Sequence, residues 1–328
     1  MKIDKLNFVF NNNLKKYFLY ALGEIILIVS GILIAMKVDN YNTTRKYENV
    51  MDQNFKKVAN ELKNNLDNSK IGIDYLKKQD SLIRLIMLDS FNEMDYRNQR
   101  DLAGISMTFM NSMIGVFDYN NLLNYNVSDK QYHSDLILKL RNTYGYRDFM
   151  TENESIIKKF VKENSIPFFL KNVNSFEQYL YFEKQNNELY SFLLTSKDYK
   201  KLLSQYAQLN YHFLLSYQMF YENGILAYEE LAKQYELEPI NPSFNNISNK
   251  RISGKYLSLQ LQDTTTIVEE NDTLFVINGK NKKKLIYLND NQFFYKLNDG
   301  MYPFLTFKND SIFHVHSKAL DFQFYKIK

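Results

Sequence analysis

Two histidines near the end of the chain have a spacing that could bind a metal ion. His314 and His316 flank Val315 in a segment with the two-residue alternation of a β-strand, so both side chains are expected on one face of a sheet. Two imidazoles at this spacing can bind zinc when further ligands come from elsewhere in the fold. No third ligand can be identified from the sequence. We therefore favour an ordinary strand position for both histidines and keep a zinc site as the alternative.

The rest of the chain offers little other chemistry. His133 and His212 have no histidine or carboxylate at metal-binding spacing on the same predicted helix face, so we expect structural roles for both. The sequence has no cysteine, which excludes disulfides, thiolate metal sites and cysteine nucleophiles. It also has no glycine-rich phosphate loop and no G-x-S-x-G nucleophile motif. We predict no catalytic site, no metal and no cofactor; a metal-dependent hydrolase would depend on His314 and His316 alone.

One acidic residue lies inside the most apolar stretch of the chain. Residues 17–36 read YFLYALGEIILIVSGILIAM, and Glu24 is their one charged side chain. A stripe of mostly small residues recurs every four positions around it, at Gly23, Leu27, Gly31 and Ala35. Such a stripe lets two membrane helices approach closely, so it could be a seam for self-association or partner docking with Glu24 hydrogen-bonding across it. The alternative is an ordinary membrane helix in which Glu24 reaches toward the interface.

The same stretch predicts a transmembrane helix at 17–38. About 20 residues cross a hydrocarbon core of roughly 30 Å. Tyr17 and Tyr20 at its start, and Lys16 and Lys37 at its ends, are typical interfacial anchors. A cleaved signal peptide would have a shorter apolar run and small residues before its cleavage site. A soluble core helix would be shorter, or polar on one side.

The charges on the two sides of the span nearly balance. The basic tail at 1–16 and the residues after the span, 37–57, carry similar numbers of lysines and arginines. Moving a short cationic tail outward is unfavourable, whereas export of a long domain is largely insensitive to charge. We therefore expect the tail in the cytoplasm, the span in a bacterial inner membrane and the remaining domains in the periplasm.

The N-terminal residues also carry a family pattern. Residues 16–27 read KYFLYALGEIIL, residues 31–35 read GILIA and residues 39–42 read DNYN. They resemble the start of an uncharacterised family of single-pass membrane proteins of Bacteroidota, and a looser likeness continues through 61–66 to about residue 150. The resemblance implies a membrane anchor and places Gly23 and Glu24 in the family's own pattern. It implies no activity, because the family has none assigned.

The region 39–238 is predicted to be a helical, extracytoplasmic domain. It has a single proline, Pro167, and apolar residues recur at helical spacing, beginning with a stripe that continues the membrane helix outward. Further helices are expected at 129–144, 152–163, 175–194 and 197–234. Polar segments are expected to form turns at 88–100, 118–128 and 145–151. We predict an antiparallel helical bundle packed against the extension of the anchor.

The last part of the chain changes to β character. A linker with two prolines at 239–250 precedes segments that alternate with a period of two. Eight strands are expected, at 254–261, 265–270, 273–278, 284–288, 292–297, 305–308, 311–316 and 322–326. We predict a small antiparallel meander or half-open barrel at 251–328. The order of a glycine, an acidic turn and aromatic positions in this segment weakly resembles the lipocalin-like β domains appended to some bacterial serine hydrolases. In those proteins the β unit is accessory. The pattern is carried by Gly254, Tyr256, Leu274, Leu288, Phe293 and Phe307.

Composition narrows the choice of function. The 328 residues are 45% hydrophobic and 24% charged, and the net charge of +4 comes from interspersed charges, so we expect no nucleic-acid partner. The preferred hypothesis is a non-enzymatic interaction or scaffold protein, anchored in a lipid bilayer, that associates with itself or with another membrane or envelope protein. The alternative is a ligand-sensing periplasmic domain that signals through a partner membrane protein.

Overall fold

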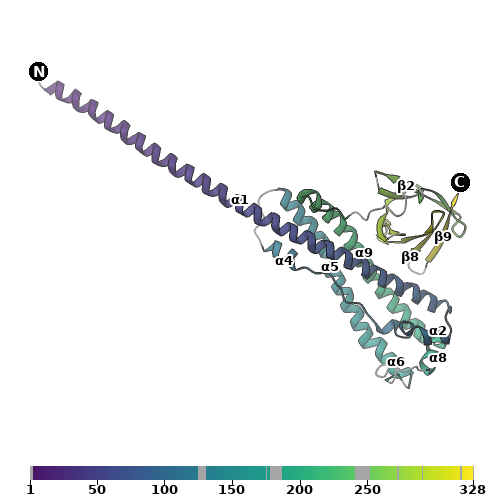
Figure 1. Cartoon of the computed structure of the whole chain (residues 1–328). Helices are drawn as coiled ribbons and strands as arrows, with labels where there is room; N and C mark the ends of the chain where they lie inside the picture. The colour runs from purple at the N-terminus through teal and green to yellow at the C-terminus, as the bar shows by residue number, and fades with distance from the viewer. Residues whose placement is uncertain are drawn as a thin grey trace.

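The computed structural model describes residues 3–124, 131–174, 176–177, 187–240, 252–271, 273–289, 291–317 and 320–327. The fold is mostly helical, with a C-terminal antiparallel sheet of nine strands that is nearly closed and barrel-like. One long helix projects from the remainder as a rod with the N-terminus at its far end, and the β unit lies beside the helices at the other end (Figure 1). The predicted fold class, an extended first helix followed by a bundle and a small β unit, is confirmed.

The first helix, α1 (Ile3–Met87), runs for 85 residues without interruption. At 1.5 Å per residue it is about 130 Å long. No proline precedes Pro167, so nothing removes a backbone donor inside α1. The helix ends where Asp89 adopts a left-handed φ of 55° and the Ser90 amide donates to the Leu85 carbonyl, which satisfies an end of the helix that would otherwise lack a partner.

Three long helices form the bundle. The second half of α1 contributes a buried stripe that begins with Met51, Phe55 and Val58, each 0% exposed. It packs closely against α9 (Lys197–Tyr235), which also packs against α5 (Gln131–Phe160), and side chains of α1 such as Phe55 and Glu61 reach α5. The helix predicted at 197–234 is therefore confirmed almost to the residue, and the linker predicted at 239–250 lies largely outside the described residues.

Contacts at both ends of the bundle give the helix directions. Phe55 of α1 stacks on Tyr235 of α9, with ring centroids 5.8 Å apart, while Asp89 just after α1 pairs with Lys200 near the start of α9. The two helices are thus antiparallel. Phe160 at the end of α5 contacts Tyr206 in the first part of α9, and Lys139 in the first part of α5 pairs with Glu230 near the end of α9, so α5 is antiparallel to α9 as well.

Two glycines allow α1 and α9 to approach closely. A Cβ atom on Gly72 of α1 would lie 2.6 Å from Cε1 of Tyr217, and one on Gly224 of α9 would lie 2.8 Å from Cδ2 of Leu66. Real Cβ atoms essentially never lie this close to another heavy atom, so a larger residue at either position would force Tyr217 or Leu66 to shift.

The turn predicted at 145–151 is wrong. The helices expected on either side of it form one continuous α5, because the polar residues of this segment lie along a helix that is exposed on one face, and Gly145 lies in open space. The helix then widens into a π turn (Val161–Ser165), where the Ile166 amide donates to the Val161 carbonyl, just before Pro167. Two short helices follow, α6 (Ile166–Asn172) and α8 (Asn187–Thr195). Much of the helix expected at 175–194 lies outside the described residues.

A largely irregular segment, called the strap below, leads from α1 toward α5 and is described for residues 88–124. It contains four short helical pieces: α2 (Glu93–Asn98), α3 (Arg100–Ala103), η1 (Ile105–Met107) and α4 (Phe117–Leu123). Residues 108–116 between the last two are not helical. The turns expected at 88–100 and 118–128 are therefore only partly right, because α2 and α4 lie within them.

The β unit is an antiparallel meander whose two edge strands, β4 and β5, follow one another in the chain. The strands are β1 (Gly254–Ser258), β2 (Asp263–Glu270), β3 (Thr273–Asn278), β4 (Asn281–Lys284), β5 (Ile286–Asn289), β6 (Gln292–Phe294), β7 (Phe304–Asn309), β8 (Ile312–Ser317) and β9 (Leu320–Ile327). Their order in the sheet is β4-β3-β2-β1-β9-β8-β7-β6-β5, and the chain passes from edge strand β4 to edge strand β5 through Leu285. All eight predicted strands are present, and β4 is the addition; its NKKK sequence lacks the alternation that marks a strand.

Large side chains fill the interior of the β unit. Tyr256, Phe293, Phe313 and Phe324 are at most 4% exposed, and their rings contact one another or further buried aromatics. A second set of its residues joins the core of the bundle instead: Ile286, Leu288, Phe294, Tyr302 and Phe304. The β unit thus docks on the bundle through an apolar face of its own.

Candidate functional site

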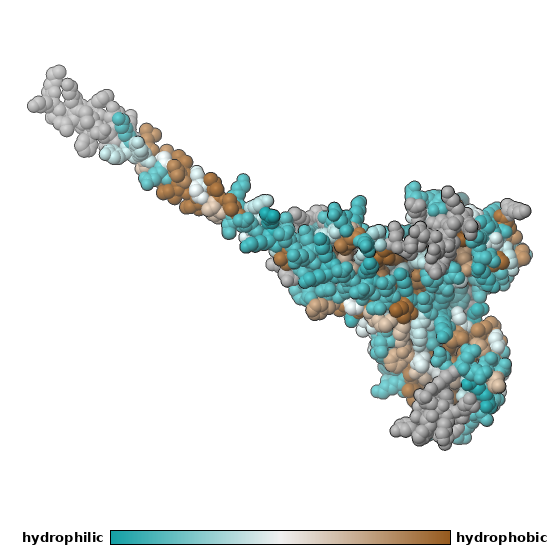
Figure 2. Space-filling view, viewed as in Figure 1, coloured by the Kyte–Doolittle hydropathy of each residue, from teal (hydrophilic) through white to brown (hydrophobic). Residues whose placement is uncertain are grey.

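The first candidate is the apolar segment, residues 17–38 of α1. Its large side chains are bare, from Tyr17 at 76% exposed to Leu27 at 76% and Val38 at 54%. Hydrophobic colour covers this part of the rod in Figure 2, between the grey tip and the hydrophilic surface of the bundle. Among the described residues, this is the one helix long and apolar enough to cross a membrane.

The predicted seam lies within this segment. Gly23, Leu27, Gly31 and Ala35 follow one another at four-residue intervals on an uninterrupted helix, so they share one face together with the neighbouring Glu24. A Cβ atom on Gly23 or Gly31 would meet nothing within 4 Å. The seam is therefore free of contacts with the described parts of its own chain.

His314 and His316, predicted as ordinary strand residues with a zinc site as the alternative, lie where the β unit docks on α1. His316 Nε2 is 2.7 Å from Oδ2 of Asp80, a residue of α1, and His314 Nδ1 is 3.3 Å from Oδ1 of Asp321 on β9. Asp321 also accepts a 3.3 Å hydrogen bond from Nη2 of Arg84 on α1. Each imidazole thus has its own carboxylate, and the described residues contain no group of three or more ligands arranged for a metal.

A half-buried lysine completes this docking cluster, which consists of Lys77, Asp80, Arg84, His314, His316 and Asp321. Lys77 Nζ donates to Oγ1 of Thr306 at 3.3 Å and lies 4.9 Å from the ring centre of Phe304. Burial lowers the pKa of Lys77 to about 8, against the opposing pull of Asp74 and Asp321. The lysine is therefore held at this interface at an electrostatic cost.

Further polar contacts join α9 to the β unit next to this cluster. Gln218 Nε2 donates to the Tyr302 carbonyl at 3.1 Å, and the Tyr302 hydroxyl donates to Oε2 of Glu222 at 2.6 Å. Burial, and then the hydrogen bond to the Glu222 carboxylate, raise the pKa of Tyr302. Two helices and three strands thus meet in one interface. The spacing of Lys77, Asp80 and Arg84 places them on one face of α1, which could have suggested an interface there. The sequence could not have shown which strands bind this face.

A second polar network fastens the strap to α1. Glu61 Oε2 accepts the Asp118 amide at 2.8 Å, while its Oε1 accepts the Tyr119 amide at 3.3 Å and the Tyr144 hydroxyl at 2.8 Å. Burial and the Glu61 carboxylate raise the pKa of Tyr144. One turn further along α1, Asn65 accepts the Gly115 amide and donates to the Gly115 carbonyl, both at 2.8 Å. No motif marks Glu61 as the residue that caps α4.

His133 and His212, for which the sequence predicts structural roles, each contact side chains near them in the bundle. His133 is 5% exposed, lies against the ring of Phe55 at 5.3 Å and is 3.9 Å from Asp52 of α1. His212 is 2.9 Å from Nε2 of Gln208, one turn earlier on α9. The Asp52 carboxylate near His133 comes from a different helix, so spacing along one helix could not have predicted it.

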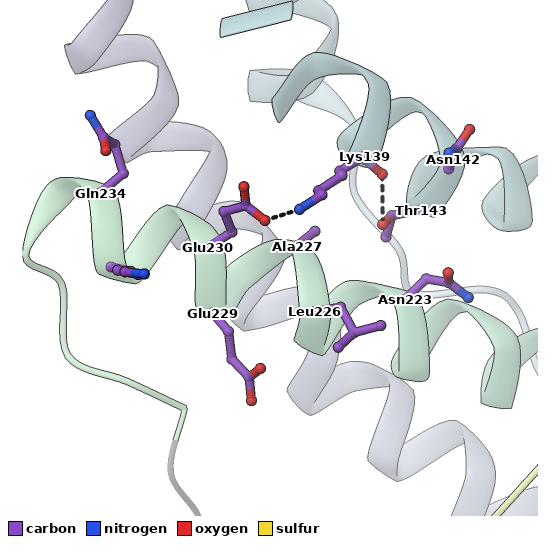
Figure 3. Close-up of a pocket in the computed structure, with 10 residues that line it drawn as sticks. Lys139, Asn142, Thr143, Asn223, Leu226, Ala227, Glu229, Glu230 and Gln234 are labelled. Carbon is purple, nitrogen blue, oxygen red and sulfur yellow. Dashed lines mark hydrogen bonds and ion pairs between the residues drawn. The ribbon is translucent and has the colours of Figure 1, made fainter. Parts of the chain in front are cut away.

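Among the described residues, the bundle has two sizeable surface hollows. The larger is a groove of about 760 Å³ between α5 and α9, which the ion pair of Lys139 with Glu230 crosses (Figure 3). That ion pair neutralises Lys139 and Glu230, and the groove is also lined by Glu229 and Lys233. The smaller hollow, of about 420 Å³, lies between α1 and α4. It is lined by Asn54, Lys57, Asp118, Asn121 and Asn124.

Comparison with known proteins finds no matching family model, no similar curated protein and no similar solved structure. Both family resemblances read from the sequence therefore stay predictions, and the function has to be argued from the geometry alone.

Proposed function

We propose that this protein is a membrane-anchored, non-enzymatic interaction or scaffold protein of the bacterial envelope. The observation that carries the proposal is the apolar segment, which is bare on every side and continues without a break into a packed bundle helix. Fully burying a side chain such as leucine, isoleucine or phenylalanine is worth about 1.5–3 kcal/mol. A run of this length therefore needs a lipid or protein environment.

Lipid is the environment that fits the segment best. Exposed apolar side chains lie on all sides of the helix at 17–38, whereas docking on a single protein partner would require one apolar stripe. In hydrocarbon a helix satisfies every backbone donor and acceptor within itself. The small residues of the seam would then let a second copy, or another membrane protein, pack closely on one side.

The orientation is part of the proposal. The basic tail at 1–16 stays in the cytoplasm, and the bundle and the β unit stand in the periplasm on the rigid continuation of α1. From Val38, the end of the apolar segment, to Met51, the first buried residue of the bundle, the helix rises about 20 Å. The bundle is thus held clear of the membrane surface, where an envelope partner can reach it.

Fractionation of cells that produce the full chain tests the anchor. We expect the protein in the membrane fraction, resistant to salt and alkaline wash and released by detergent. A matched chain without 17–38 should appear in the soluble fraction. Protease added to spheroplasts should remove a C-terminal tag. Recovery of the full chain in the soluble fraction would overturn the anchor, and a protected tag would overturn the orientation alone.

A further inference from the structure

We propose that the hollow between α1 and α4 binds a small zwitterion of the amino-acid class. The five residues that line its volume of about 420 Å³ are all polar: Asn54, Lys57, Asp118, Asn121 and Asn124. This volume is within the usual range for small-molecule sites. The inference goes beyond the anchoring role and does not depend on it.

Two charged side chains and one buried amide that line the hollow have no partner among the described residues. Asn54 is 9% exposed, and its Nδ2 is screened from solvent without a hydrogen-bond partner. Lys57 and Asp118 form no ion pair with any described residue. Buried amides in native proteins are nearly always hydrogen-bonded. We take a buried amide without a partner, beside the exposed Lys57 and the half-buried Asp118, as the pattern of a site that a ligand completes.

The charges select the class of ligand. The described residues that line the hollow offer one ammonium, Lys57, and one carboxylate, Asp118, so their charges cancel. An anion would leave the carboxylate unmatched, a cation would leave the ammonium unmatched, and a neutral polyol would meet neither with an opposite charge. A free amino acid carries both charges on one small frame. The three asparagine amides can then bond a polar side chain, because the described residues that line the hollow are all polar.

The position of the hollow links a ligand to the membrane helix. Asn54 and Lys57 belong to α1, about 24 Å along the helix from Val38 at the end of the apolar segment. Asp118 and Asn121 belong to α4, which Glu61 of α1 already caps. A bound zwitterion would bridge the two elements and stiffen the strap against the helix that carries the anchor.

The test is ligand-induced stabilisation of the full chain in detergent. Each standard free amino acid is added singly, with glucose as a polyol and succinate as a dianion, and the midpoint of thermal unfolding is followed. We expect one or more polar amino acids to raise the midpoint. Lys57→Gln and Asp118→Asn should each lower the affinity for that ligand by about tenfold or more, since each removes one charge-assisted hydrogen bond. Lys56→Gln, an exposed neighbour outside the hollow, is the matched control and should bind as the wild type does.

Each other outcome counts against the site. The proposal is overturned if no amino acid raises the midpoint, if glucose or succinate raises it as much, or if the shift is the same in Lys57→Gln and Asp118→Asn as in Lys56→Gln. Because all four proteins keep the apolar segment, membrane fractionation of the same variants separates a failure of this site from a failure of the anchor.

Discussion

The two halves of α1 are the same helix in two different environments. At 17–38 the large apolar side chains point outward in all directions and are 43–82% exposed, whereas from Met51 to Ile86 the apolar side chains form one stripe and the buried ones are at most 3% exposed. Both halves are apolar enough to need burial. The first has apolar residues on all faces and suits lipid, while the second has polar residues on its remaining faces and suits a bundle in water. The angular distribution of apolar residues, more than their number, distinguishes the two.

A phenylalanine truncation in each half tests this difference most strongly. Phe55→Ala, at 0% exposed, should lower the free energy of unfolding of the bundle by about 3–5 kcal/mol, because it leaves a cavity among packed helices. Phe18→Ala, at 68% exposed, should change it by about 0.5 kcal/mol or less. Both values come from denaturant unfolding of the full chain in detergent, followed by far-UV circular dichroism. Equal losses would mean that the apolar segment also packs on protein.

The second prediction concerns the far end of the bundle half, where α1 meets the β unit. The pKa of Lys77 is lowered from 10.5 to about 8, so the folded state favours the neutral lysine. The destabilisation is complete below pH 8 and is relieved as the pH rises from about 8 to 10.5. Stability should therefore rise across this window, by about 3 kcal/mol at most.

The substitution Lys77→Met isolates that contribution. It should raise the stability at pH 7 and flatten the rise between pH 8 and 10.5, because it removes the buried charge while keeping the chain length. Lys78→Met, at a neighbouring exposed lysine, is the control and should retain the wild-type pH profile. Urea unfolding at a series of pH values measures all three proteins. A wild-type slope that survives in Lys77→Met would assign the pH dependence to another group.

A feature of this structure could be predicted from the sequence where residues close together in the chain determine it. The apolar segment, α9 and eight strands each carry their own periodicity and were predicted. The continuous α5 was missed, because Gly145 and the polar residues around it look like a turn until a neighbouring helix shows which face is solvated. The docking cluster could not be found, because Asp80 and His316 are separated by 236 positions and no pattern links a helix face to a particular strand. The same holds for Glu61, whose partners on α4 are backbone amides that any residue type could supply.

The Glu61 network gives the third prediction. Glu61→Gln keeps the shape but replaces a charged acceptor, so α4 should loosen from α1 and the free energy of unfolding should fall by about 1–3 kcal/mol. Hydrogen exchange at the Asp118 and Tyr119 amides should accelerate, while Glu229→Gln, at an exposed position on α9, should leave both amides protected. Unchanged exchange in Glu61→Gln would show that the strap is held without this carboxylate.

The smallest expected effect concerns the apolar segment at 17–38, where small side chains rather than large ones favour helix association. Within the bundle, large side chains hold the helices together, whereas in lipid the tails are as apolar as leucine and close approach of small residues is what favours association. Gly31→Leu should therefore weaken self-association by about 1–2 kcal/mol, seen as loss of a crosslinked dimer in native membranes. Val29→Leu, which adds volume off the seam, is the matched control and should leave the dimer intact. If Gly31→Leu crosslinks as well as Val29→Leu does, the seam contributes nothing, and the apolar segment serves only to hold the bundle at the membrane.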